Sequence, residues 1–269
     1  MNISFFGYSK PAEKLCRFLT KSDIEIKGIF DISLQKCVEF ASIADSKAFL
    51  DINEAMEKSD IIFVNDDRQL KSYITHIRNS SYVNKIICLI SSGNTSDATY
   101  THEHNTHISV YSPCLLSDDN TKNMHLNLIT EGFGINYTDF TEFLVEKHIP
   151  FTQISIDKAK ELHTFINLYT NGIQTLTKIL NNTLTEMNIN TEDVTAQLTS
   201  LITDSSLPSG SFFTNDTYSI IRTIDSLKSL DNPKILSLYR ILGLNAVNFT
   251  TLNKDEKEHL MNIIIDNKK

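Results

Sequence analysis

Hydrophobic and polar positions in the first half of the chain follow two alternating patterns. Short apolar runs over residues 2–6, 61–64 and 86–90 are typical of strands buried on both faces. Between them, segments such as residues 11–20 and 33–42 repeat with helical periodicity. The same reading predicts strands over residues 25–30, 108–111, 126–129 and 151–156, and helices over residues 51–58, 67–79 and 139–147. This alternation predicts an α/β domain with a mainly parallel sheet and helices on both faces.

From residue 157 the pattern becomes helical throughout. A first helix is predicted over residues 157–188, followed by helices over residues 192–204, 216–230, 233–249 and 254–266. We therefore expect two domains, residues 1–156 and an all-α domain over residues 157–269. The first helix would be ~48 Å long at 1.5 Å per residue, longer than a domain of this size needs. Its apolar face, from Leu162 to Leu180, is accordingly expected to continue into a homodimer interface.

Charge and composition exclude several classes of partner. The net charge is −8 and the isoelectric point near 5.5, which argues against nucleic acid and anionic membrane surfaces as partners. No apolar run reaches the ~20 residues of a membrane span, and no secretory signal precedes the first predicted strand. The four cysteines form no CxxC pair. We expect a cytoplasmic protein with reduced thiols.

One loop offers candidate metal ligands. His102, His104 and His107 lie within six residues of one another, and Glu103 adds a carboxylate. No second group of ligands elsewhere in the sequence supports a metal site at this loop. The expectation is therefore that the protein holds no metal ion.

The turn after the first predicted strand carries the main binding motif. Gly7, Ser9 and Ala12 occupy the three positions of a Rossmann dinucleotide fingerprint, whose residues are normally Gly, Gly, and Gly or Ala. Lys10 adds a cation at the start of the following helix, where anions are favoured. Asp31 ends the second strand, where an acidic residue accepts hydrogen bonds from a ribose 2′-OH and repels a 2′-phosphate. The turn predicts a Rossmann-type domain that binds NAD or NADP, with NAD favoured. The alternative is a turn that only caps its helix.

Further short segments point to a family. Asn65 and Asp66 follow the strand over residues 61–64, and Ser92 follows the next strand. Other matching segments are Ser112-Pro113, the stretch LHTFINLYTNGIQTL with His163 and Asn171, and Gly210-Ser211 with Asp216. With these, the chain resembles the Rossmann-like NAD(P)-oxidoreductases that carry a C-terminal helical domain of unknown function. They belong to the wider group of 6-phosphogluconate dehydrogenase, pyrroline-carboxylate reductase and ketopantoate reductase.

The resemblance implies an NAD(P)-dependent oxidoreductase acting on a small carbonyl or imine metabolite. It also implies cofactor contacts from Asn65, Asp66 and Ser92. Three positions depart from the family pattern: Ser9 replaces a glycine, Ser112 replaces a histidine, and Thr214-Asn215 replaces an Arg-Gly pair. These departures leave open a second reading, a catalytically silent binding or regulatory protein that keeps the fold.

His163 and Asn171 are the candidate catalytic residues. Histidine titrates near neutral pH, and His163, Asn167 and Asn171 form a polar stripe at i, i+4 and i+8 on the long helix. The stripe could face a cleft, with His163 as proton donor and Asn171 holding a substrate carbonyl or the nicotinamide amide. The alternative is that the stripe is the solvated face of an amphipathic helix.

Overall fold

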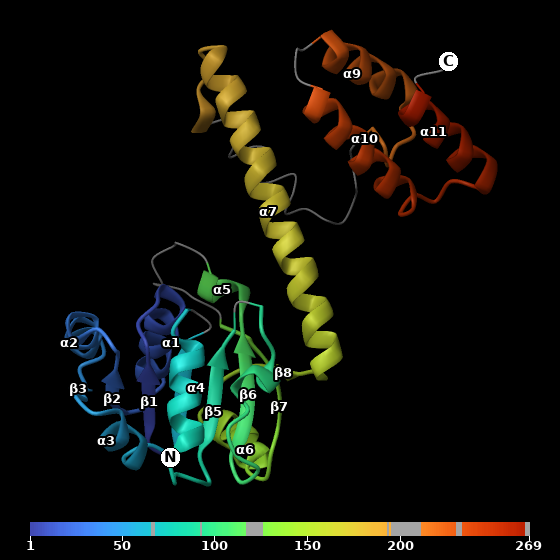
Figure 1. Ribbon diagram of the computed structural model, residues 1–269. Helices are drawn as coiled ribbons and strands as arrows, with labels where there is room; N and C mark the ends of the chain where they lie inside the picture. The colour runs from blue at the N-terminus through green and yellow to red at the C-terminus, as the bar shows by residue number, and fades with distance from the viewer. Residues whose placement is uncertain are drawn as a thin grey trace. The chain divides into compact units, whose positions relative to one another are not determined.

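The computed structural model describes residues 1–65, 68–91, 93–116, 126–192, 194, 211–229 and 233–266. The chain divides into two compact units, Met1–Thr175 and Leu176–Lys269. The long helix α7 (Ile156–Glu186) begins at the predicted domain boundary and passes through this division. The two units are therefore joined by a continuous helix (Figure 1).

The first unit is built on one eight-stranded sheet of order β3-β2-β1-β4-β5-β6-β7-β8. Its strands are β1 (Ile3–Phe6), β2 (Ile26–Phe30), β3 (Lys47–Ala48), β4 (Ile61–Asn65), β5 (Ile86–Ile90), β6 (Thr106–Tyr111), β7 (Leu128–Phe133) and β8 (Phe151–Gln153). Neighbouring strands are parallel except β6 and β7, which are antiparallel. The prediction of a mainly parallel Rossmann-type sheet is confirmed. Its order reverses between β1 and β4, and open α/β sheets bind ligands at such a switch point.

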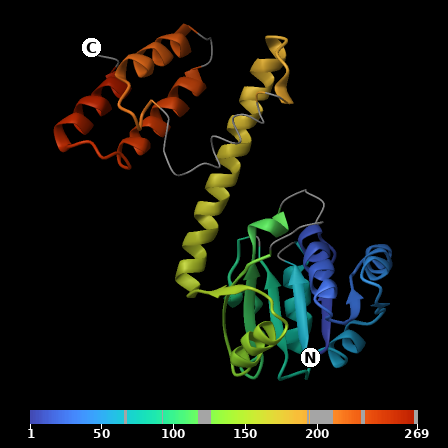
Figure 2. The same cartoon turned by 180° about the vertical axis from the view of Figure 1, so that it is seen from behind.

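Helices cover both faces of the sheet, as predicted. They are α1 (Lys10–Lys21), α2 (Leu34–Ile43), α3 (Ile52–Glu57), α4 (Leu70–Asn79), α5 (Pro113–Leu116), α6 (Tyr137–Glu146) and the 3-10 turn η1 (Ser96–Thr99). Figures 1 and 2, seen from opposite sides, show α3 and α4 on one face and α1 and α6 on the other. The elements β3, η1 and α5 were not predicted, because two to four residues are too few to show a period.

Each face of the sheet has its own apolar core. Phe5 of β1 stacks on Phe63 of β4 and meets Phe40 of α2 edge-on. On the opposite face, Phe6 and Val64 pack with side chains of α3 and α4. Phe5 and Phe6 are consecutive, so the period of two along β1 places one ring in each core. Both cores extend without a break across the central strands. These strands therefore end together at one edge of the sheet.

Three cysteines lie in these layers. Cys16, Cys37 and Cys88 are buried and make no disulfide. Burial raises the pKa of the Cys16 thiol to about 12. Burial likewise raises the pKa of the Cys88 thiol, which sits in the middle of β5. These thiols are protonated and unreactive in the folded protein.

The described elements of the second unit are helices, as predicted. Helices α9 (Thr217–Ser229), α10 (Pro233–Val247) and α11 (Lys254–Asp266) surround a small core of Ile220, Ile224, Val247, Leu260, Ile263 and Ile264. Most of the helix predicted over residues 192–204 lies outside the described residues. Among the described helices, none combines the length and the apolar character that crossing a bilayer would take.

Candidate nucleotide-binding and catalytic site

The turn between β1 and α1 requires a glycine at position 7. Gly7 has a φ of +87°, and its backbone N–H donates a 2.8 Å hydrogen bond to the carbonyl of Phe30. A Cβ atom at this position would lie 3.0 Å from Asn65 Nδ2 and 3.3 Å from Tyr73 Cε2. Gly7 thus allows the tight turn and lets β4 side chains approach the backbone closely.

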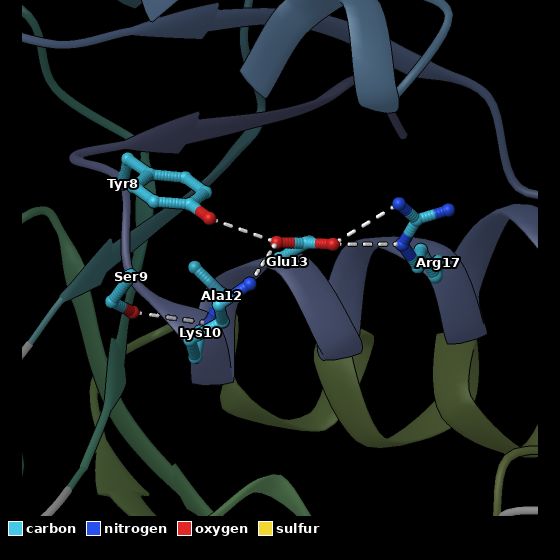
Figure 3. A network of polar contacts seen from close by, with 6 residues as sticks. All are labelled: Tyr8, Ser9, Lys10, Ala12, Glu13 and Arg17. Atoms are coloured by element: carbon cyan, nitrogen blue, oxygen red, sulfur yellow. Dashed lines mark hydrogen bonds and ion pairs between the residues drawn. The ribbon is translucent and has the colours of Figure 1, made fainter. Parts of the chain in front are cut away.

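Ser9 is the N-cap of α1, and it needs no glycine-like conformation. Its φ is −151°, and its Oγ accepts a hydrogen bond from the backbone N–H of Ala12 at 3.2 Å (Figure 3). The same hydroxyl donates to Asn65 Oδ1 at 2.8 Å. In the described part of the chain, the backbone N–H groups of Ser9 and Lys10 meet no acceptor. The helix start therefore keeps two donors for an anion, although Ser9 takes up the third.

A polar network fixes the first turns of α1 (Figure 3). The Glu13 carboxylate accepts hydrogen bonds from Tyr8 Oη at 2.9 Å and from Arg17 Nε at 3.1 Å. Burial opposes ionisation of Glu13, but these hydrogen bonds outweigh it and lower the pKa of the carboxyl. Lys10 Nζ reaches Glu13 only at 3.5 Å, from a side chain that is 76% exposed. An ion pair with so exposed a lysine is weak, so the Lys10 side chain can turn toward a bound phosphate.

Asp31 ties the end of β2 to this turn. One carboxylate oxygen accepts the backbone N–H of Tyr8 and the other that of Ser33, both at 2.7 Å. The side chain is buried, so its charge is fixed beside the turn. Each oxygen of a carboxylate has a second lone pair, so these bonds leave room for a ribose hydroxyl. Asp31 has a structural role that the sequence did not indicate.

Asn65, the last residue of β4, lies across the switch point from the turn after β1. The residue is 2% exposed, and its Nδ2 has no hydrogen-bond partner among the residues that the structure describes. A buried amide N–H without an acceptor costs about 1–3 kcal/mol. Asp66 and Ser92, the other two predicted cofactor contacts at this edge, lie outside the described residues.

His163 lies at the other end of the same edge. It is on the third turn of α7, 4% exposed, with its ring centroid 4.8 Å from that of Tyr111, the last residue of β6. His163 Nδ1 and Tyr111 Oη are both buried, and neither has a hydrogen-bond partner within the described part of the chain. The two residues bring α7 against the carboxyl end of β6.

Glu131 of β7 anchors this junction. Its carboxylate accepts the backbone N–H of Ser96 at 2.6 Å and the Ser96 hydroxyl at 2.7 Å. Burial is the largest influence on Glu131 and raises the pKa of the carboxyl, although Ser96 and His163 oppose the rise. The sequence analysis missed Glu131, Ser96 and Tyr111. A single acidic residue within the apolar run LITEGF was the available signal for Glu131.

The structure does not bring the rest of the polar stripe into this buried group. Asn167 and Asn171 are exposed along α7, whereas His163 is buried. The histidine loop forms no ligand group either: the rings of His102 and His104 lie 5.1 Å apart, but His107 is buried in β6, with its Nε2 3.3 Å from the backbone carbonyl of His102. Over the described ranges, no three His, Cys, Asp or Glu side chains converge as a metal site would require.

No family model and no curated protein matches this sequence. Among solved structures, the chain is similar to a Bacteroides fragilis protein proposed to be an NADP oxidoreductase. That likeness has a TM-score of 0.69 at 12% identity and covers 91% of this chain and 97% of the other. Protein TM1727 of Thermotoga maritima gives 0.67 at 14% identity, covering 96% and 98%.

A third similar structure is the reductive aminase of Aspergillus terreus in complex with NADPH and ethyl-5-oxohexanoate. Its TM-score is 0.59 at 10% identity, covering 98% of this chain and 92% of the aminase. At such low sequence identities, these similarities are evidence for the fold alone. This chain has a Rossmann-like sheet followed by C-terminal helices, over nearly the full length of proteins built the same way.

Proposed function

We propose that this protein binds a nicotinamide dinucleotide across the β1–β4 switch point and is an NAD(P)-dependent oxidoreductase of a small carbonyl or imine compound. The observation that carries the proposal is the unpaired, buried Nδ2 of Asn65 beside Gly7. A folded protein gains nothing from an amide left in this state. A ligand oxygen at the turn would complete its hydrogen bonding.

The residues around the turn fit such a cofactor. A pyrophosphate would take the backbone N–H groups of Ser9 and Lys10, with the Lys10 ammonium nearby and the positive end of the α1 dipole behind them. Ala12 is fully buried, so α1 packs closely on the sheet at this point. Asn65, Asp66 and Ser92 are the proposed contacts along the carboxyl edge. When bound, the nicotinamide supplies the hydride chemistry that protein side chains lack.

Asp31 supports a preference for NAD(H). Its buried carboxylate can accept a ribose 2′-OH, while a 2′-phosphate of about −2 charge would be repelled. The reductive aminase that is similar in fold was solved with NADPH, the cofactor that bears the 2′-phosphate. The preference of this chain therefore depends on the charge at Asp31.

His163 is the proposed proton donor. The substrate carbon would receive a hydride from the reduced nicotinamide, and its oxygen or nitrogen a proton from the imidazolium of His163. Asn171, two turns further along α7, is the proposed contact for a substrate carbonyl or the cofactor amide. Both residues belong to the helical region 157–269, which we propose as the substrate and dimerisation domain.

A homodimer is part of the proposal. Phe165, Leu168 and Tyr169 of α7 are 59%, 67% and 65% exposed. Large apolar side chains grouped on one helix are typical of an interface with a second copy. Sedimentation equilibrium is expected to give twice the chain mass of 30.5 kDa, and a clean monomer would contradict the dimer.

The cofactor proposal is tested by calorimetric titration of the full chain with NADH and NADPH. We expect both to bind, NADH more tightly. Asn65→Ala should weaken the binding of NADH by about ten- to a hundredfold, because one hydrogen bond to a charged group contributes about 1.5–3 kcal/mol. Asn79→Ala, at the exposed end of α4, is the matched control and should bind like the wild type.

Each contrary result has a definite meaning. Tighter binding of NADPH than NADH would overturn the role given to Asp31. No heat with either dinucleotide would favour the second reading, a silent protein that keeps the fold.

A further inference from the structure

Unpaired polar atoms gather where β6 meets α7. Tyr111 Oη, Ser112 Oγ and His163 Nδ1 are buried, and the described residues offer none of them a hydrogen-bond partner. Tyr111 and Ser112 are consecutive, and the Tyr111 ring packs on that of His163. Each such atom lowers the stability of the folded protein, and nothing in the fold compensates for the loss. The Tyr111 and His163 side chains, in contact with each other, call for a ligand that would pair with them.

The register of the sheet places this group beside the proposed cofactor site. Asn65 of β4 is aligned with Ile90 of β5, and Ile90 with Val110 of β6. Tyr111 therefore lies one residue beyond the row that starts at Asn65, at the same carboxyl edge but with its side chain on the opposite face of the sheet. Two strand spacings of ~4.8 Å separate β4 from β6, so a molecule held at Asn65 lies about 10 Å from Tyr111 along the sheet edge.

Neighbouring residues hold the Tyr111–His163 pair in place. Glu131 faces Ser109 across β6 and β7, so it shares a sheet face with Tyr111, about 7–8 Å away on the diagonal. Its hydrogen bonds to Ser96 fix the start of η1. The next residue, Asp97, pairs with Lys160 at 3.7 Å, one helical turn before His163. Sheet, η1 and α7 are thus connected by a short chain of polar contacts.

The charges around the pair disfavour an anionic ligand. Glu131 brings a buried carboxyl group and Asp97 a second acidic group. Among the described ion pairs, the one at this junction joins Lys160 to Asp97 at 3.7 Å; both side chains are more than half exposed, so the lysine lies in solvent outside the buried pair. Apart from the proposed imidazolium of His163 itself, the described residues bring no buried cation to this junction for the carboxylate of a 2-oxo acid.

We propose that Tyr111 donates a hydrogen bond to the carbonyl oxygen or imine nitrogen of an uncharged substrate packed against His163. This inference rests on the proposed function and adds the substrate class to it. Burial raises the pKa of the Tyr111 phenol, which keeps the hydroxyl protonated as a donor. Tyr111 therefore orients the reacting group, and the proton itself comes from His163. Ser112, the next residue, gives a second hydroxyl at the end of β6.

The first test is thermal unfolding of the free full-length protein. Tyr111→Phe removes the unpaired hydroxyl and keeps the ring against His163, so the midpoint of unfolding is expected to rise. Tyr82→Phe, next to the opposite end of β5, is the matched control and should not raise it. A lower midpoint for Tyr111→Phe would show that the hydroxyl has a structural partner and would overturn the proposal.

The second test is NMR of protein labelled at the tyrosine Cζ carbon and saturated with the dinucleotide that it binds. The Tyr111 signal, assigned by its loss in Tyr111→Phe, is expected to shift with cyclohexanone, an uncharged ketone, and to stay in place with pyruvate. A shift with pyruvate, or no shift with cyclohexanone, would overturn the inference. Dinucleotide binding is measured beforehand by calorimetry, so failure of the cofactor proposal would be seen separately.

Discussion

The turn after β1 and the junction of β6 with α7 lie on the same edge of the sheet. They differ in whether their polar side chains are hydrogen-bonded. At the turn, Ser9 and Asp31 are paired with neighbouring backbone N–H groups and stabilise the fold without any ligand. At the junction, Tyr111 and His163 keep unpaired atoms in a buried position. Each such atom costs about 1–3 kcal/mol. Ser9 and Asp31 are thus explained by folding alone, whereas the unpaired atoms of the junction, like Asn65 Nδ2 beside the turn, are evidence for function.

The largest expected effect concerns the residue that holds the junction together. Glu131→Ala leaves the Ser96 N–H and hydroxyl without an acceptor in a buried place. We expect the free energy of unfolding to fall by about 3 kcal/mol, measured by urea denaturation.

The control for this variant is Glu161→Ala on the exposed face of α7, which should stay within about 0.5 kcal/mol of the wild type. Similar losses from both variants would mean that the junction has no special stability. The comparison between the two regions would then fail.

The next effect concerns the turn. Gly7→Ala places a Cβ on a residue with φ of +87°, 3.0 Å from Asn65 Nδ2. The left-handed conformation alone costs about 1–2 kcal/mol, and the close contact adds to it. Thermal unfolding would measure the loss.

Gly172→Ala is the matched control, because Gly172 lies within α7 with open space around its Cβ position. There the same change should stabilise the protein by about 0.5–1 kcal/mol. If both glycines respond alike, the turn does not depend on Gly7.

The smallest expected effect separates a cap that makes its hydrogen bond from one that does not. Ser9→Ala removes the acceptor of the Ala12 N–H and should cost about 1 kcal/mol. Ser33 is the N-cap of α2 but makes no side-chain capping bond, so Ser33→Ala should change stability much less. Equal losses at the two positions would show that the Ser9 hydrogen bond contributes nothing.

The architecture was largely predictable because its signals are local. Apolar runs such as residues 61–64 and 86–90 identified β4 and β5, and the change of period near residue 157 marked the start of α7. The final part of β7 was missed, since Glu131 interrupts the apolar pattern where the prediction ended at residue 129. That glutamate is interpretable only once β7 is known to pair antiparallel with β6.

The candidate site was less predictable, since it depends on which part of a helix touches the sheet. His163, Asn167 and Asn171 are equivalent by spacing, yet only His163 is buried. Periodicity describes a face along a whole helix and does not show where another element covers it. The role of Asp31 in holding the turn was hidden for the same reason, because its partners Tyr8 and Ser33 belong to separate segments.

The cysteines give this chain a natural reporter of local opening. All four lie within residues 16–114, so none belongs to the second unit. Because Cys16, Cys37 and Cys88 are buried, a thiol reagent reaches them only when the sheet and its helices come apart. The rate at which these three thiols are labelled in the native protein therefore follows opening of the first unit alone. Circular dichroism, which records helices of both units, would report a different event if the two units open independently.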